Sequence, residues 1–403
     1  MDTRQVRIAI VGGGIGGLTA AVALRRAGAD VTVLEQAPQL LPVGASLQLG
    51  PNATRVLGEL ELLEPLRAVA SRPEAVDLLR WGDGSLLLHA EHGDAAERHF
   101  GTPQLDFFRP DLHGALLGAL PAETIELGAR VVDAAQRGDA VELLLDDGHR
   151  VEADGVVAAD GIRSPLRQLL VGADDPVFSG TVVFRGVIAR AEAEDLHPDR
   201  TNRYWIGPYR HGVSYWIARG SLLALNLGVQ RANWSEESWT REVPAAEADA
   251  YLEGWDDALR ERVRRCGTLL RGGVFVRRPI PHWSYGRITL LGDAAHAMEP
   301  FQAQGAAQAV EDAYVLGRCV ADAGDDVEEA FGRYERIRLD RAEELQAQAR
   351  GAGDEFFLED GPDQVARDER FRRLAETQPF GTRQLVWEYD VRSALGQAAA
   401  NTP

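Results

Sequence analysis

The sequence of 403 residues contains no lysine, so all 43 of its basic residues are arginines. Acidic residues number 62, and the formal net charge at pH 7 is −19. An acidic chain is not attracted to polyanions, which argues against sequence-independent binding to nucleic acid or to anionic membrane surfaces. Any anionic ligand must therefore be held locally, by arginines, by protonated histidines or at helix N-termini.

Cysteines and long apolar runs are also scarce. Cys266 and Cys319 are too few for a disulfide framework and fit a reducing compartment. No apolar run reaches the 18 residues that a membrane-spanning helix needs, and the chain enters a strand-like run without a signal peptide. These absences predict a cytoplasmic protein that does not bind membranes, and the composition, 45% hydrophobic and 26% charged, is typical of a globular fold.

The beginning of the chain predicts a β–α–β unit. Residues 6–11 are apolar, residues 15–27 are rich in Ala and Leu, and residues 31–34 are largely β-branched. Gly28 supplies the expected helix stop. Such a unit indicates a parallel sheet covered by helices.

The middle of the chain predicts a second sheet. Turn residues at 81–84 and 147–148 separate short apolar runs into hairpins, and alternating segments follow between residues 181 and 227. A strand at 287–291 then resembles those of the first unit, and helices are expected at about 305–320 and 327–350. We therefore expect a discontinuous nucleotide-binding domain with a β-rich insertion, followed by polar C-terminal helices.

A glycine-rich turn carries the first chemical signal. Gly12, Gly14 and Gly17 satisfy G-x-G-x-x-G between the first strand and the helix that starts near Ile15. The helix N-terminus favours a pyrophosphate, and Glu35 at the end of the second strand is placed to bind a ribose diol. This context predicts dinucleotide binding without separating NAD from FAD.

Two later segments each lead from a strand into an aspartate. Asp160-Gly161 precedes a predicted helix start that contains Arg163. Asp293 follows the strand at 287–291, can accept hydrogen bonds from a polyol, and comes shortly before a helix that begins near Gly305. His296 lies between them and is interpreted as a packed side chain rather than a base.

The order and spacing of these three motifs resemble the single-component, FAD-dependent aromatic hydroxylases known as group A flavoprotein monooxygenases. The stretch at 304–313 and Trp387-Glu388-Tyr389-Asp390 resemble the salicylate hydroxylase and 6-hydroxynicotinate 3-monooxygenase branch. The resemblance implies an α/β fold, with a Rossmann-like FAD-binding domain, an inserted β-sheet substrate domain as in p-hydroxybenzoate hydroxylase, and C-terminal helices. We expect the FAD-binding domain at residues 1–73, 98–176 and 284–350, the substrate domain at 74–97 and 177–283, and the C-terminal helical segment at 351–403.

The resemblance also implies tightly bound FAD and transient NADH or NADPH. The expected FAD-binding residues are Gly12, Gly14, Ile15, Gly17, Glu35, Arg109, Asp160, Asp293, Pro300, Gly305 and Ala306. The reaction would hydroxylate a small aromatic or heteroaromatic phenol or acid with O2 through a C4a-hydroperoxyflavin, and would need no metal. Met298, Glu299 and Gln302 depart from the family pattern near the expected pocket, so the substrate is not carried over.

The substrate pocket is expected from the inserted sheet and the loop after Glu35. His211 and Tyr215 are four residues apart, and either could bind or deprotonate a phenol, although a loop histidine and a core tyrosine fit the same pattern. Arg185 could meet a carboxylate or a nicotinamide nucleotide, or form a structural ion pair. Gln48 lies near the expected flavin ring, or braces the backbone. Trp234, Trp239 and Trp255 are interpreted as packing residues.

Other functions stay open at this point. The same fold could catalyse oxidation, epoxidation or a Baeyer–Villiger-type oxygenation in natural-product tailoring. An NAD-dependent dehydrogenase fits the first motif alone, and a flavin-binding sensor fits all three. We expect a monomer or homodimer whose partners are the aromatic substrate and O2.

Overall fold

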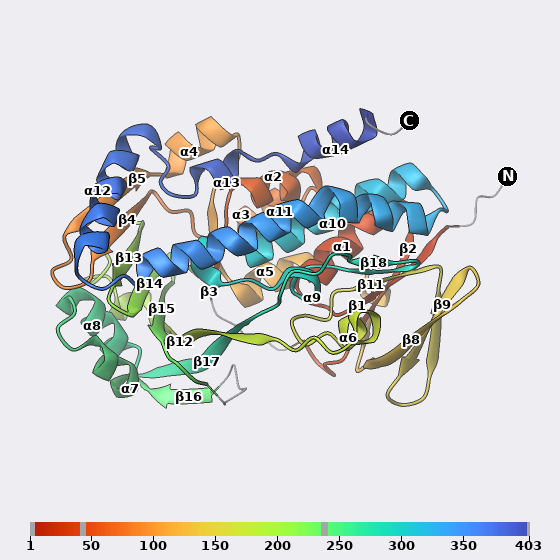
Figure 1. Cartoon of the computed structure of the whole chain (residues 1–403), viewed down its shortest axis with the longest axis horizontal. Coiled ribbons are helices and arrows are strands. Elements are labelled where there is room, and N and C mark those ends of the chain that lie inside the picture. The colour runs from red at the N-terminus through yellow and green to blue at the C-terminus, as the bar shows by residue number, and fades with distance from the viewer. Residues whose placement is uncertain (1–4, 41–45, 235–240, 401–403) are drawn as a thin grey trace.

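The first sheet is built around strands that are buried on both faces. The computed structural model describes residues 5–40, 46–234 and 241–400 (Figure 1). At the centre, β1 (Arg7–Val11) pairs in parallel with β2 (Asp30–Glu35) and with β11 (Gly155–Ala158), whose four residues are all buried. The outer strands of this six-stranded sheet are β7 (Ile125–Leu127), β19 (Ile288–Leu290) and β18 (Ser284–Tyr285). All neighbours are parallel except β18 and β19, so the predicted β–α–β unit and its parallel sheet are confirmed.

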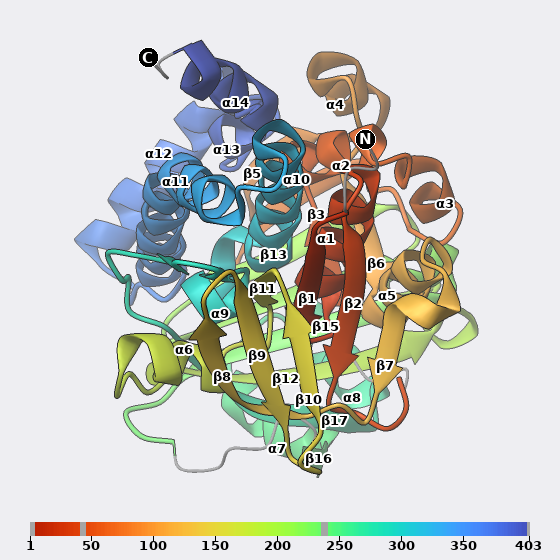
Figure 2. The ribbon, with the colours of Figure 1, turned by 90° about the vertical axis from the view of Figure 1, so that its right-hand side faces the viewer.

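Two helices lie side by side against this sheet (Figure 2). They are α1 (Ile15–Arg26) and α10 (Gly305–Ala323), and small residues allow their close approach. A Cβ atom added to Gly317 would lie 2.9 Å from the Cβ of Ala23, and one added to Gly16 would lie 3.2 Å from the Cβ of Ala309. This packing brings the N-termini of two helices from distant parts of the chain toward the same region.

The second sheet has eight strands and mixed directions. It contains the strands of the hairpin predicted at 81–84, whereas the hairpin predicted at 147–148 lies in a separate sheet. The strand order is β16 (Arg241–Pro244), β17 (Thr268–Val276), β12 (Val177–Ala189), β15 (Leu222–Gln230), β14 (Arg210–Ile217), β13 (Thr201–Gly207), β4 (Ala75–Arg80) and β5 (Leu86–Glu91). Only β13 and β4 pair in parallel within it. The predicted second sheet is thus confirmed. The predicted domain boundaries themselves stay a prediction.

Smaller elements complete the fold. Two further sheets pair β8 (Val131–Arg137), β9 (Ala140–Leu145) and β10 (Arg150–Ala153), and β3 (Ser46–Leu49) with β6 (Leu105–Phe108). The remaining helices before residue 300 are α2 (Pro51–Glu59), α3 (Leu63–Arg67), α4 (Gly93–Phe100), α5 (Arg109–Gly118), α6 (Pro165–Val171), α7 (Ala245–Asp249), α8 (Asp257–Arg265) and α9 (Asp293–His296).

A single long helix connects the two sheets. It is α11 (Val327–Phe356), which runs along the molecule in Figure 1. Near its start Phe331 packs in the core of the first sheet, and at its end Phe356 packs with Tyr204 and Tyr215 of the second sheet. The helix therefore continues six residues past the predicted end at Arg350, since Gly353 and Phe356 are still buried on its inner face.

The C-terminal segment is helical as expected, but it is not merely a polar tail. It forms α12 (Pro362–Thr377), α13 (Gln384–Glu388) and α14 (Val391–Ala400). Phe371 packs into the core of the second sheet, and Trp387 lies so close to Gly50 that an added Cβ there would be 2.1 Å from the indole nitrogen. Among the tryptophans predicted to pack, Trp255 is buried and Trp234 packs against the same cluster, whereas Trp239 lies outside the described residues.

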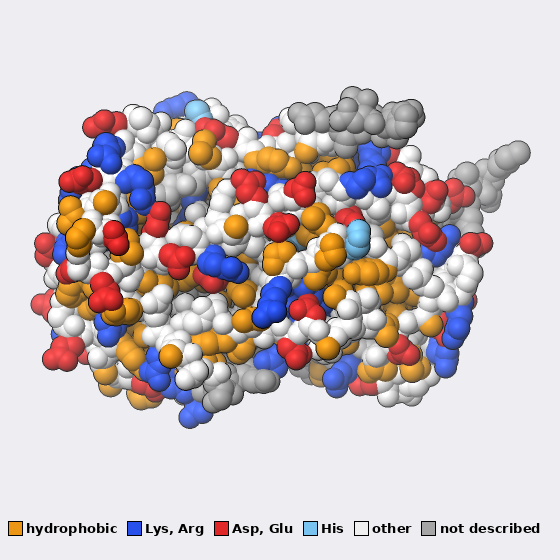
Figure 3. Space-filling model, viewed as in Figure 1, with side chains coloured by type: hydrophobic (Ala, Val, Ile, Leu, Met, Phe, Trp, Pro, Cys, Tyr) orange, Lys and Arg blue, Asp and Glu red, His pale blue; other side chains and the backbone are white. Residues whose placement is uncertain are grey.

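Charges of both signs are found together on one face of the molecule. On the face in Figure 3, arginine and acidic side chains are intermixed. None of the helices in the described ranges combines the length and apolar character needed to cross a bilayer.

Candidate active site

The glycine-rich turn is tightly enclosed on one side and open on the other. Gly12 has a φ of +106°, and an added Cβ would lie 2.4 Å from the carbonyl oxygen of Ala159. An added Cβ at Gly17 would lie 2.0 Å from the carbonyl oxygen of Gly12, whereas one at Gly14 would meet no protein atom within 4 Å. Side chains are thus excluded where the turn packs, and space remains at Gly14, where α1 begins at Ile15. This cradle fits a dinucleotide pyrophosphate.

Glu35 is held beside this turn. Its Oε2 accepts a hydrogen bond of 2.7 Å from the Gly13 amide, and its Oε1 accepts one of 2.8 Å from the Ala37 amide. Each carboxylate oxygen keeps a second lone pair, so Glu35 can still accept bonds from a ribose.

The segment of the second motif contacts both the glycine-rich turn and the third motif. Asp160 follows β11, and one of its buried oxygens, Oδ1, has no hydrogen-bond partner among the residues that the structure describes. Burial raises the pKa of Asp160 to about 6. In the helix that follows, the buried Arg167 donates to the carbonyl oxygens of Ala294 and Ala295 at 2.9 and 2.6 Å. The second motif therefore positions the backbone of the third.

Asp293 faces a cavity rather than a protein partner. Its side chain is exposed to the cavity, but the protein around it reduces its hydration. This desolvation raises the pKa of Asp293 despite the nearby charges of His296 and Arg109. Within the described ranges no hydrogen bond or salt bridge joins its carboxylate to another side chain. An added Cβ at Gly305 would be 4.0 Å from Asp293 Oδ1, so the carboxylate lies beside the N-terminus of α10.

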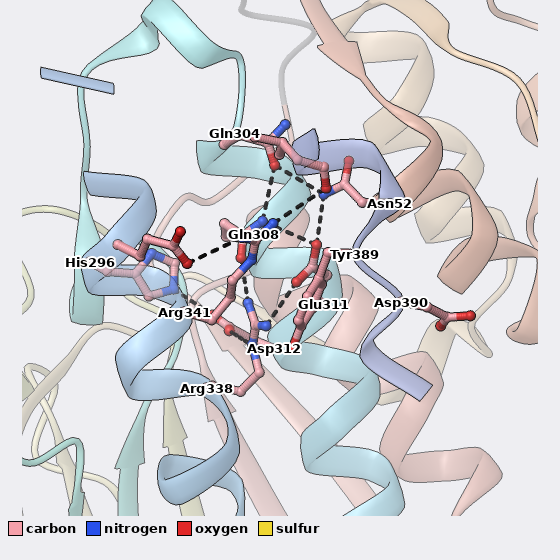
Figure 4. Close-up of polar contacts among 12 residues, drawn as sticks. Asn52, His296, Gln304, Gln308, Glu311, Asp312, Arg338, Arg341, Tyr389 and Asp390 are labelled. Carbon is pink, nitrogen blue, oxygen red and sulfur yellow. Dashed lines mark hydrogen bonds and ion pairs between the residues drawn. The ribbon is translucent and has the colours of Figure 1, made fainter. Parts of the chain in front are cut away.

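A buried polar network supports this region (Figure 4). Its centre is the fully buried Arg338, which donates to Glu311 and to Asp312 at 2.8 Å each. Asp312 also accepts from the amide of Gly292 at 3.2 Å, and His296 Nε2 lies 2.6 Å from it. We call the whole set the Arg338 network; its members are Asn52, His296, Gln304, Gln308, Glu311, Asp312 and Arg338.

The network holds both ends of the third motif. Gly292 precedes Asp293, and Gln304 precedes the first residue of α10. Although burial opposes it, the charges of His296 and Arg338 hold the pKa of Asp312 below its ordinary value. His296 is therefore buried in a structural contact with Asp312 and, as expected, is not placed as a base on the cavity.

The cavity beside Asp293 has a volume of about 450 Å³. Its walls come from the second sheet, the β3 strand and the segment that leads into α10. Eight of the predicted site residues line it: Gln48, Arg185, His211, Tyr215, Asp293, Pro300, Gly305 and Ala306. The other predicted site residues do not line this cavity: Gly12, Gly14, Ile15, Gly17, Glu35, Arg109 and Asp160. Of the residues that depart from the family pattern, Met298 and Glu299 line the cavity and Gln302 does not.

His211 is a buried strand residue rather than a loop histidine. It lies on β14 opposite Gly228 of β15, and an added Cβ at Gly228 would be 2.0 Å from the imidazole ring. Its ring contacts Phe301 and Phe357 edge-on, and burial lowers its pKa to about 4. The imidazole is therefore neutral near pH 7, and its Nδ1 has no hydrogen-bond partner in the described part of the chain.

Tyr215 projects from the same face of β14. Burial raises its pKa above the ordinary value, so the phenol is protonated and its hydroxyl donates to Ser46 Oγ at 2.8 Å. Asn226 donates to the same Ser46 oxygen at 3.1 Å. Two titratable groups that stay neutral thus stand together on one wall of the cavity.

Gln48 braces side chains rather than backbone. Its Oε1 accepts bonds of 2.6 Å from the Tyr204 hydroxyl and 2.9 Å from Arg383 Nη1. Arg383 was not among the expected site residues, because it lies in the C-terminal segment among many other arginines. Burial, aided by the charge of Arg109, lowers the pKa of Arg185, the other arginine on the cavity wall, to about 10.

The geometry combines a dinucleotide cradle with an enclosed cavity at a helix N-terminus, which is the arrangement of a flavin-dependent enzyme. The family model described as FAD binding domain matches residues 5–349, and the chain belongs to this family. It is 40% identical to a 3-amino-4-hydroxybenzoate 2-monooxygenase of Streptomyces platensis, over 91% of this chain and 93% of the relative. It is 34% identical to a 6-hydroxynicotinate 3-monooxygenase of Bordetella bronchiseptica, over 84% and 89% of the two chains.

Comparison with solved structures supports the same family. A salicylate hydroxylase in complex with substrate superposes with a TM-score of 0.83 and 25% identity, over 98% of both chains. The chain is thus an FAD-dependent aromatic monooxygenase that uses NAD(P)H and O2, and the predicted family, fold class, cofactors and reaction are confirmed. These relatives support ring hydroxylation over the oxidase, epoxidase and Baeyer–Villiger alternatives.

Proposed function

We propose that this enzyme hydroxylates a small aromatic acid that also carries a ring hydroxyl, of the same class as 3-amino-4-hydroxybenzoate. The observation that carries the proposal is the shared wall of the cavity formed by His211 and Tyr215, two neutral groups beside the N-terminus of α10. Relatives named for such acids, at 40% and 34% identity, support this substrate class. A cavity of about 450 Å³ has room for a single aromatic ring next to a flavin ring.

The residues of the three motifs are proposed to hold FAD. Gly12, Gly14, Gly17 and Ile15 would hold the phosphates at the start of α1, and Glu35 would bind the adenosine ribose. The remaining proposed FAD contacts are Arg109, Asp160, Asp293, Pro300, Gly305 and Ala306. Bound FAD supplies hydride acceptance from NAD(P)H and activation of O2. The N-terminus of α10 would stabilise negative charge there.

The cavity side chains would bind and orient the ring. Tyr215 and His211 are placed to hydrogen-bond the ring hydroxyl, and the neutral imidazole would accept a hydrogen bond from it. Phe301 and Phe356 cover the cavity with apolar surface that excludes water. Arg185 and Gln48 are proposed to complete the polar lining.

The test compares substrate-stimulated NAD(P)H oxidation and product formation for 3-amino-4-hydroxybenzoate, 3-hydroxybenzoate and 6-hydroxynicotinate. At least one acid should stimulate oxidation and be hydroxylated by the wild type. Tyr215→Phe should keep FAD but lower hydroxylation of that acid by roughly 10-fold, the equivalent of one hydrogen bond. Hydrogen peroxide release should rise as coupling falls.

Tyr209→Phe is the matched control, because Tyr209 is exposed on the turn between β13 and β14 and does not line the cavity. Wild-type hydroxylation in Tyr215→Phe would remove this residue from the site. A wild type that responds to none of these acids would contradict the proposed substrate class. The cytoplasmic location and the monomeric or homodimeric state stay predictions.

A further inference from the structure

Arg383 reaches the cavity from the C-terminal segment. It caps α13 at the N-terminus, far along the chain from the second sheet, yet its side chain lines the cavity. Its Nη1 donates to Gln48 Oε1 and its Nη2 donates to the Tyr204 hydroxyl, both at 2.9 Å. Tyr204 itself donates to Gln48 at 2.6 Å, and the guanidinium carbon lies 5.4 Å from the Tyr204 ring centroid. Two strands of different sheets therefore hold this guanidinium in place.

No carboxylate among the described residues is bonded to Arg383. Its bonded partners, Gln48 and Tyr204, are neutral acceptors, and it forms no salt bridge within residues 5–40, 46–234 and 241–400. The acid that its charge reaches is Asp106, which is buried and already accepts bonds from Asn202 and Gln104. A cation at a cavity wall whose hydrogen bonds go only to neutral groups can bind an anionic ligand.

The second arginine on the cavity wall is Arg185, which lies on β12 opposite Asn226 of β15. Arg185 lies near Arg109, and the same Arg109 acts on Asp293, which is proposed to bind FAD. The charge of Arg383 acts on Asp106, Tyr215 and His92. Both arginines line the cavity, and Arg383 is the one that contacts Gln48 and Tyr204 and whose charge acts on Tyr215.

We propose that Arg383 binds the carboxylate of the aromatic acid, so that the C-terminal segment supplies the charge that selects acids over neutral rings. This inference rests on the proposed function, since it requires an aromatic acid as substrate. A planar guanidinium pairs with a carboxylate through two parallel hydrogen bonds, which a lysine cannot reproduce. Gln48 and Tyr204 act as positioning residues for this arginine.

The experiment uses the FAD-loaded enzyme and two matched ligands, the best acid found in the substrate panel and its primary amide. Binding is measured without turnover, by the change that the ligand causes in the flavin absorbance. Arg383→Gln should weaken binding of the acid by roughly 10- to 100-fold, the range of a charged hydrogen bond, and change binding of the amide by less than about 3-fold. Arg383→Lys should recover part of the lost affinity for the acid only.

Two control variants separate the possible outcomes. Arg373→Gln removes an arginine of α12 whose side chain is 70% exposed, and it should bind both ligands as the wild type does. Equal losses for acid and amide in Arg383→Gln would show a structural role and overturn the proposal. Acid-selective loss in Arg185→Gln but not in Arg383→Gln would also overturn it. A wild type that binds no aromatic acid contradicts the proposed function and this inference together.

Discussion

Two polar regions border the third motif, and they differ in whether their charged side chains form salt bridges. In the Arg338 network, Arg338, Glu311 and Asp312 are fully buried, and each charge has its opposite within 2.8 Å. In the cavity, the carboxylate of Asp293 and the guanidinium of Arg383 have no salt-bridge partner among the described residues. The charges of the first region hold backbone in place, and those of the second are the ones that we propose to bind ligands.

This difference indicates how to separate structural from functional polar residues in the chain. Removing one member of a paired buried set leaves an uncompensated charge, so the fold suffers. Removing an unpaired group relieves a desolvation cost, so the fold is spared and ligand binding suffers.

The largest effect is expected for Arg338→Met. Glu311 and Asp312 would then be buried without their cation, which should lower the free energy of unfolding by about 3–5 kcal/mol. FAD should also be lost, because the network holds Gly292 and Gln304. Urea unfolding and the flavin-to-protein absorbance ratio measure the two effects.

Arg336→Met is its control, since Arg336 lies on the same helix with a side chain that is 62% exposed. A stability equal to that of the wild type in Arg338→Met would show that the network does not support the fold, and the contrast with the cavity would fail.

Asp293→Ala should reverse the pattern. Its carboxylate is desolvated and unpaired in the described part of the protein, so the apoprotein should be at least as stable as the wild type. FAD affinity should fall by roughly 10- to 100-fold, because charged hydrogen bonds to the cofactor are lost. Thermal unfolding of apoprotein and titration with FAD measure these effects. Full FAD retention would remove Asp293 from the cofactor site.

The smallest effect is expected in the pH dependence of stability. Burial lowers the pKa of His211 from an ordinary 6.5 to about 4, so between these values the unfolded chain binds a proton that the folded chain does not. The free energy of unfolding is therefore not reduced by this histidine above pH 6.5, and it decreases as the pH falls from 6.5 toward 4. His211→Asn lacks this decrease. The difference in free energy of unfolding between the wild type and this variant should therefore fall by about 2 kcal/mol between pH 7 and pH 5.

His92 and His197 are also buried with lowered pKa values, but they are the same in both proteins and cancel in this difference. A gap that is independent of pH would show that His211 is accessible to protons in the folded protein.

Much of the fold could be predicted from the sequence because its signals are local. The turn at Gly12 to Gly17, the flanking strands and the helix stop at Gly28 are all encoded within a few residues. The end of α11 was misplaced, since Gly351 and Gly353 weaken helix propensity, and only packing of Phe356 against the second sheet carries the helix onward.

Part of the cavity lining could be predicted for the same reason. His211 and Tyr215 share one face of a strand through a period of two, so their common orientation was visible in the spacing. Arg338 and Arg383 had no such signal, because each is one of 43 arginines and each acquires its role from contacts with residues far away in the sequence.

The sequence by itself determined the nucleotide-binding turn, the parallel unit and the class of chemistry, since glycine geometry, strand periodicity and helix N-termini act over short distances. Only the tertiary structure decided which charges are paired and which face the cavity. Burial and pairing depend on which side chains the fold brings within about 3 Å of one another, and these can be hundreds of residues apart in the sequence. A local sequence pattern therefore does not predict them.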